Sequence, residues 1–143
     1  MTDKSPSAPS PHCPSARPEM AESVVFGVVG GTVAEPRLGY LEKPLPVTPE
    51  ILALSGPVPP GEVFRFAAPC AGGGCQHFDG ARCRLVERVV RLLPVVDDRL
   101  PPCQLRPTCV WWQQEGPAAC RRCPQIVSDS YAPTDEMTRA ATP

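Results

Sequence analysis

The sequence predicts a small, loop-rich α+β domain with a short β-hairpin, two to three short helices and disordered ends. Proline and glycine supply 21 and 11 of the 143 residues, and both favour turns over long regular elements. Aromatic residues make up only 6% of the chain, so the hydrophobic core is expected to be small. Such a domain usually needs covalent or metal staples. The eight cysteines therefore predict a metal-stapled fold, and they argue against a helical bundle, a coiled coil or a large α/β enzyme.

Both ends of the chain are predicted to lack fixed structure. Residues 1–22 form a disordered arm in this interpretation, because serine and proline dominate and no apolar run is present. Cys13 lies in this arm, apart from the other seven cysteines, so its substitution is expected to leave metal content unchanged. The tail, 128–143, is expected to be flexible.

The N-terminal composition also bears on localisation. Residues 1–22 do not have the pattern of a secretory signal, and the apolar stretch 24–33 is too short to span a bilayer. We therefore expect a cytoplasmic protein that does not associate with membranes. Thiols stay reduced in that compartment, so disulfides are the least favoured use of the cysteines.

Residues 23–62 are predicted to form a small β-hairpin and one short helix. The β-branched run 23–29 predicts a strand, and 37–42 predicts its partner. Gly30 and Gly31 are interpreted as the turn between them. Their pattern lacks the glycine order of a dinucleotide-binding loop.

Three helices are expected along the chain. Thr48 is a suitable N-cap for a helix within 47–56. Apolar residues at helical spacing across 83–93 predict an amphipathic helix, which Pro94 ends. A shorter helix is predicted at 108–116, and its two tryptophans are expected to pack in the core.

Residues 63–127 contain the other seven cysteines and provide the strongest chemical signal. Their spacing is C-x4-C-x7-C-x19-C-x5-C-x10-C-x2-C, over Cys70, Cys75, Cys83, Cys103, Cys109, Cys120 and Cys123. The last two form a CxxC knuckle, whose thiolates can both reach one metal ion at ~2.3 Å. A thioredoxin-like role for this pair needs a βαβ setting that the sequence does not predict. The cysteines therefore indicate metal binding.

Two kinds of metal centre stay open, and an iron–sulfur cluster is favoured narrowly over zinc. A cluster needs four thiolates and tolerates irregular spacing. Its negative charge is expected to be offset by nearby arginines, namely Arg82, Arg84, Arg121 and Arg122. Zinc needs four ligands per ion, and seven cysteines with His77 supply the eight ligands of two closed sites. A hydrogen bond within its own turn is the other interpretation of His77.

The charge pattern suggests the kind of partner. Residues 63–127 carry nine arginines and five acids, which gives +4, whereas the whole chain is −1. This excess is small for a nucleic-acid-binding surface, so a protein partner is expected and nucleic acid is the weaker alternative. The predicted function is a metal-binding accessory or electron-transfer protein, with a zinc-stapled adaptor for protein or RNA as the alternative. No general base or substrate pocket indicates an independent enzyme.

Overall fold

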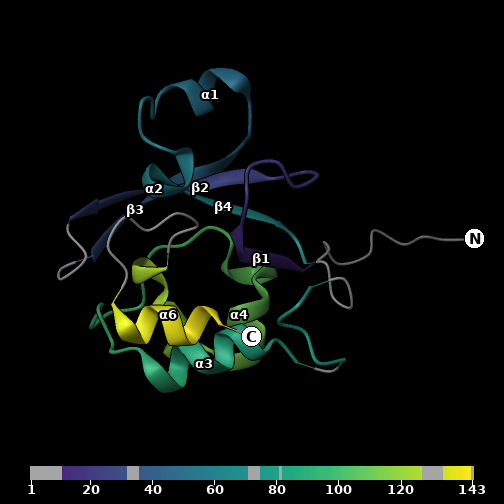
Figure 1. The fold of residues 1–143 in the computed structure, drawn as a ribbon, viewed down its shortest axis with the longest axis vertical. Helices are drawn as coiled ribbons and strands as arrows, with labels where there is room; N and C mark the ends of the chain where they lie inside the picture. Colours follow the sequence, from purple (N-terminus) through teal and green to yellow (C-terminus); the bar gives the residue numbers. More distant parts are fainter. Residues whose placement is uncertain (1–10, 32–35, 71–74, 81, 127–133, 143) are drawn as a thin grey trace, which may run out of the picture.

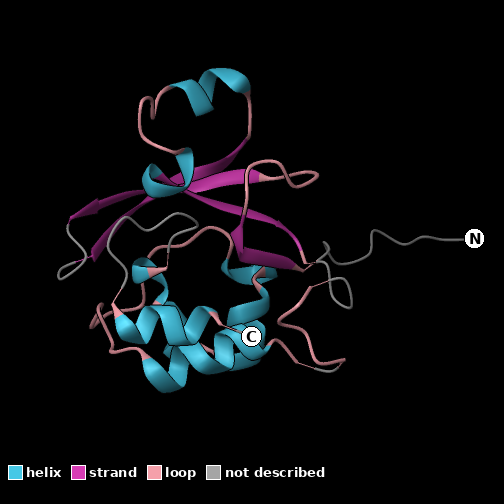
Figure 2. Cartoon of the chain, in the orientation of Figure 1, coloured by secondary structure: helices cyan, strands magenta, loops and turns pink. Residues whose placement is uncertain are grey.

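The computed structural model of the chain describes residues 11–31, 36–70, 75–80, 82–126 and 134–142. It confirms the predicted α+β class. Figure 1 shows a four-stranded antiparallel sheet with a layer of helices from the C-terminal half on one side. The short helices α1 (Pro49–Ala53) and α2 (Pro60–Val63) lie on the other side of the sheet (Figure 2). No helix in the described ranges has the length and apolar character needed to cross a membrane.

The sheet has the strand order β1-β4-β2-β3. Its members are β1 (His12–Ala16), β2 (Val24–Gly31), β3 (Pro36–Pro46) and β4 (Phe64–Pro69). The hairpin of β2 and β3 confirms the predicted pair of strands. Gly30 and Gly31 pair with Arg37 and Pro36 and so belong to the strand rather than to the predicted turn. The pairing with β3 extends β2 through both glycines, and residues 32–35 lie outside the described part of the chain.

β4 is a central strand of the sheet that was not predicted. Its residues belong to the predicted cysteine-rich segment, 63–127. It pairs with β1 on one side and with β2 on the other. Phe66 packs in one core cluster and Ala67 in another, so β4 is buried on both faces. A strand buried on both faces lacks the alternation of polar and apolar residues that identifies strands in sequence. The predicted boundary between the segments 23–62 and 63–127 therefore cuts through the sheet. It places β4 in a different segment from the two strands that pair with it.

β1 corrects the prediction that residues 1–22 are a disordered arm. His12 lies opposite Pro69, and Cys13 lies opposite Ala68. Pro14 cannot donate a backbone hydrogen bond, which an edge strand tolerates. The order of this segment comes from pairing with β4, which the local composition does not reveal. Residues 1–10 lie outside the described residues.

The helices are short and mostly lie where the sequence predicts them. They are α1 (Pro49–Ala53), α2 (Pro60–Val63), α3 (Arg84–Leu92), α4 (Val110–Glu115), α5 (Pro117–Cys120) and α6 (Asp135–Ala141). Thr48 caps α1 as predicted, since its Oγ1 accepts a hydrogen bond from the Ile51 N–H at 3.2 Å. Two 3-10 turns, Arg106–Thr108 and Cys123–Gln125, adjoin α4 and α5.

The helical layer has its own core, which includes part of the predicted flexible tail. Val86 and Val89 of α3 are fully buried in one cluster with Trp111 of α4, whereas Trp112 is only partly buried. α6 packs on α3, and Arg88 Nε donates to the Ala140 carbonyl at 2.8 Å. The prediction of a flexible 128–143 is therefore wrong for α6, because an amphipathic helix gains burial only once α3 is present. Residues 127–133 and 143 are not described.

Candidate metal-binding site

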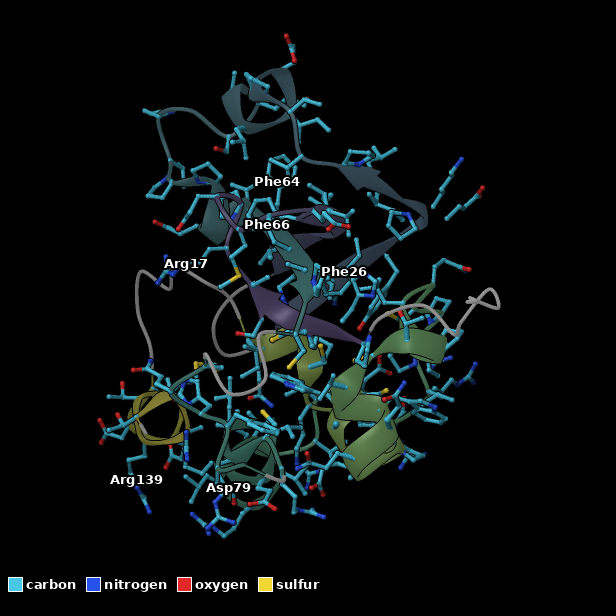
Figure 3. All side chains as sticks on the ribbon, turned by 90° about the vertical axis from the view of Figure 1, so that its right-hand side faces the viewer. Arg17, Phe26, Phe64, Phe66, Asp79 and Arg139 are labelled. Carbon is cyan, nitrogen blue, oxygen red and sulfur yellow. The ribbon has the colours of Figure 1, made fainter. Side chains whose placement is uncertain are left out.

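The eight cysteines are free thiols, and their electrostatic effects on one another's pKa divide them into two groups of four. We call Cys13, Cys70, Cys75 and Cys83 the first quartet, and Cys103, Cys109, Cys120 and Cys123 the second quartet. Members of one quartet lie close enough to act on each other electrically. Burial is the main cause that raises the pKa of Cys13, and the charges of the other three members of the first quartet add to it. The charges of Cys123 and Cys103 likewise add to the effect of burial on the pKa of Cys109 in the second. Figure 3 shows sulfur atoms between the sheet and the helical layer.

The second quartet is assembled by two consecutive turns and a knuckle. The Arg106 N–H donates to the Cys103 carbonyl at 3.4 Å, and the Cys109 N–H donates to the Arg106 carbonyl at 3.2 Å. Gly116, at φ 66°, turns the chain sharply between α4 and α5, and glycine adopts this conformation without strain. α5 then ends at Cys120, and the following turn carries Cys123. All four cysteines line a cavity of about 20 Å³.

Arg65 of β4 is a buried cation in contact with the second quartet. Only 1% of the residue is exposed. One guanidinium nitrogen lies 3.2 Å from Cys123 Sγ and 2.7 Å from the Pro14 carbonyl oxygen, and the other donates to the Cys123 carbonyl at 2.5 Å. No carboxylate within the described ranges forms an ion pair with it. A guanidinium keeps its charge inside a protein, and a buried charge is costly unless an opposite charge lies near.

Arg106 and Trp111 bring further donors to the same cavity. Burial raises the pKa of Cys120, whereas a hydrogen bond from Arg106 lowers it. Arg106 Nε and Trp111 Nε1 are buried without a hydrogen-bond partner among the described residues. Buried donors of this kind suit an electron-rich sulfur centre, whose ligands are oriented and tuned by surrounding N–H groups.

The thiols must move closer together and lose their protons before they can bind metal. No three His, Cys, Asp or Glu side chains in the described part of the chain lie close enough together to hold one ion. Burial is the main cause that raises the pKa of Cys13 and of Cys109 to about 12, so both are protonated at neutral pH. Metal binding would therefore draw the sulfurs of a quartet together and release their protons.

These raised pKa values predict how the metal-free protein responds to alkali. The ordinary thiol pKa of 9.0 applies to the unfolded chain, and the folded chain ionises only near pH 12 at Cys13 and Cys109. The contribution of these two thiols to the free energy of unfolding is therefore fully present below pH 9. It is lost as the pH rises from 9 towards 12. Tyr40, whose pKa is raised chiefly by burial, acts in the same direction.

Urea titrations of metal-free, reduced protein at a series of pH values measure this loss. The double variant Cys13→Ala/Cys109→Ala is the control and should lose less stability above pH 9. An equal alkaline loss in the control would contradict the assignment to these two thiols.

His77 has a partner that conflicts with its predicted role as a ligand. Its Nδ1 lies 2.7 Å from a guanidinium nitrogen of Arg88. Arginine can only donate, so Nδ1 accepts, and the neutral ring then carries its proton on Nε2. Burial and the charge of Arg88 lower the pKa of His77, which favours this neutral form. Neither ring nitrogen has a lone pair free for a metal in this arrangement.

Three of the four arginines predicted to offset a centre have other partners for their side chains in the described structure. Arg82 binds Glu87 and Glu115, and Arg84 binds Glu87, both as exposed pairs. Arg122 donates to the carbonyls of Leu93 and Ala118 at 2.8 Å. Arg121 is exposed. In the described structure, the arginines that contact thiols are Arg65 and Arg106 instead.

Sequence reasoning missed Cys13 and Arg65. The only signal for Arg65 is a charged residue inside the apolar run FRFAA, and Cys13 has no local signal. Comparison with known proteins adds no further guide: no family model matches the chain, and no matching curated protein or solved structure is found.

Proposed function

We propose that this protein binds a metal centre through the thiolates of the second quartet, with an iron–sulfur cluster as the first candidate. The observation that carries the proposal is the burial of Arg65 against Cys123 with no carboxylate partner among the residues that the structure describes. Neutral thiols leave that charge uncompensated, whereas four thiolates around a metal supply negative charge next to the guanidinium. The protein would act as an accessory or electron-transfer protein that works with a protein partner in the cytoplasm.

The donors around the cavity favour the cluster. Hydrogen bonds to sulfur are one of the means by which proteins set the potential of an iron–sulfur centre. Arg65 reaches Cys123, Arg106 reaches Cys120, and Trp111 has a buried N–H without an acceptor in the described structure. The inorganic sulfides of a cluster would provide additional acceptors for these groups.

Zinc is the second candidate, and the size of the cavity favours it. A volume of about 20 Å³ is close to that of a single water-sized sphere. One ion bound by four thiolates occupies less volume than an iron–sulfur cluster, so the small cavity favours zinc. In that case the centre would have a structural role, in an adaptor for a protein or RNA partner.

Anaerobic purification followed by analysis of iron, acid-labile sulfide and zinc tests the proposal. A brown protein with iron and sulfide in equal amounts supports the cluster, and a colourless protein with stoichiometric zinc supports the adaptor. Cys120→Ser should lower the metal content, and His77→Ala, a control outside the second quartet, should leave it unchanged. Protein that holds neither metal, even after anaerobic reconstitution, would refute the proposed function.

A further inference from the structure

We propose that the first quartet is a second metal centre and that Cys13, on β1, supplies its fourth thiolate. The inference rests on the proposed function, because it extends the same thiolate chemistry to a separate set of residues. It removes His77 from the ligands expected from the sequence and gives each centre four cysteines.

The strand register brings the first two ligands together. Cys13 lies opposite Ala68 in the antiparallel pair of β1 and β4, and the Cys70 N–H donates to the Pro11 carbonyl at 2.9 Å. Residues 68 and 70 lie on one face of an extended chain, so Cys70 is the diagonal neighbour of Cys13 on that face. Diagonal neighbours are about 7–8 Å apart between their Cα atoms, and their side chains can meet at one ion or cluster.

A closed turn brings the other two ligands together. The Phe78 N–H donates to the Cys75 carbonyl at 3.1 Å, and Phe78 forms an antiparallel bridge with Cys83. The Arg84 N–H also donates to the His77 carbonyl at 2.7 Å. These bonds hold Cys75 and Cys83 at the base of one loop, as in a metal-binding knuckle.

Cys83 is also held in place by α4. Its backbone N–H donates to Gln114 Oε1, and Gln114 Nε2 donates to the Cys83 carbonyl, both at 2.9 Å. Cys83 is the N-cap residue of α3, where the positive end of the helix dipole favours a thiolate. Burial raises the pKa of Cys83, and the N–H groups of Val86 and Leu85 oppose that effect.

β1 lies between the two quartets and contacts both. Cys13 belongs to the first quartet, whereas its neighbour His12 forms a parallel bridge with Cys109 of the second. The carbonyl of Pro14 accepts a hydrogen bond from Arg65, and Pro14 lines the cavity of the second quartet. Binding at Cys13 would therefore fix the strand that forms one wall of the other site.

Two measurements test this assignment. The native protein is alkylated with iodoacetamide and the modified cysteines are identified by mass spectrometry, and its metal content is determined in parallel. In metal-loaded wild type, all eight cysteines should resist alkylation, and metal content should correspond to two centres. Cys13→Ser should halve the metal content and expose Cys70, Cys75 and Cys83, while the second quartet stays protected. That protection shows that the variant is folded.

Three further variants complete the test. Cys70→Ser should give the same half-loss, Cys120→Ser should expose only the second quartet, and His77→Ala should retain both centres. Full metal content in Cys13→Ser, or a wild type with one centre that only Cys120→Ser removes, overturns the inference and leaves the proposed function intact. A wild type that binds no metal overturns both.

Discussion

Replacing Arg65 with methionine is expected to destabilise the metal-loaded protein by roughly 3–5 kcal/mol, because it removes one partner of a buried charge pair. In the metal-loaded protein the partner would be the thiolate of Cys123, whose sulfur lies 3.2 Å from the guanidinium. In metal-free protein the same substitution removes a buried cation that has no counter-charge. There the carbonyls of Pro14 and Cys123 lose a donor and Phe26 loses its contact with the guanidinium, but removal of the uncompensated cation offsets these losses. The net loss of stability should therefore be smaller than in the loaded protein.

Chemical denaturation of loaded and metal-free samples, with and without the substitution, measures the difference. Arg37→Met on the exposed part of β3 is the matched control and should change neither form by more than about 0.5 kcal/mol. Arg65→Met should also release the metal of the second quartet more readily to a competing chelator. An equal loss of stability in the two forms would show that Arg65 serves packing and carbonyl bonding rather than a charged centre.

Removing metal from the wild-type protein is expected to lower its melting temperature strongly and to leave a weaker cooperative transition. Structural zinc in small domains contributes an apparent ~10–16 kcal/mol, whereas the total stability of a domain is about 5–15 kcal/mol. The second quartet lies where the sheet meets the helical layer, since Arg65 of β4 contacts Cys123 and Pro14 of β1 lines the cavity of this quartet. Loss of the centres should therefore loosen the contact between the two layers.

Scanning calorimetry of reduced samples, before and after treatment with a chelator, measures this effect. The double variant Cys13→Ser/Cys120→Ser, which lacks a ligand in each quartet, is the control, and chelation should not change its melting behaviour. Stripped wild-type protein with an unchanged transition would mean that the apolar clusters alone hold the fold. The thiols would then have another role.

The elements that were predicted well are those whose signal is local. Thr48 identifies the start of α1, and the apolar stripe with Pro94 identifies α3, because capping and helical periodicity act within a few residues. The hairpin of β2 and β3 is likewise a contact between neighbouring segments. The predictions failed at β1 and β4, whose partners are distant in sequence.

The composition and cysteine spacing alone predicted a small α+β protein rich in cysteine, because these properties depend on residue types and short-range order. Only the tertiary structure decided how the thiols are grouped. Pairing of β1 with β4 brings Cys13 beside Cys70, and burial of β4 carries Arg65 to Cys123. Both contacts join segments more than 50 residues apart. Their stabilisation comes from a sheet that exists only after the chain has folded, so local patterns of residues cannot encode them.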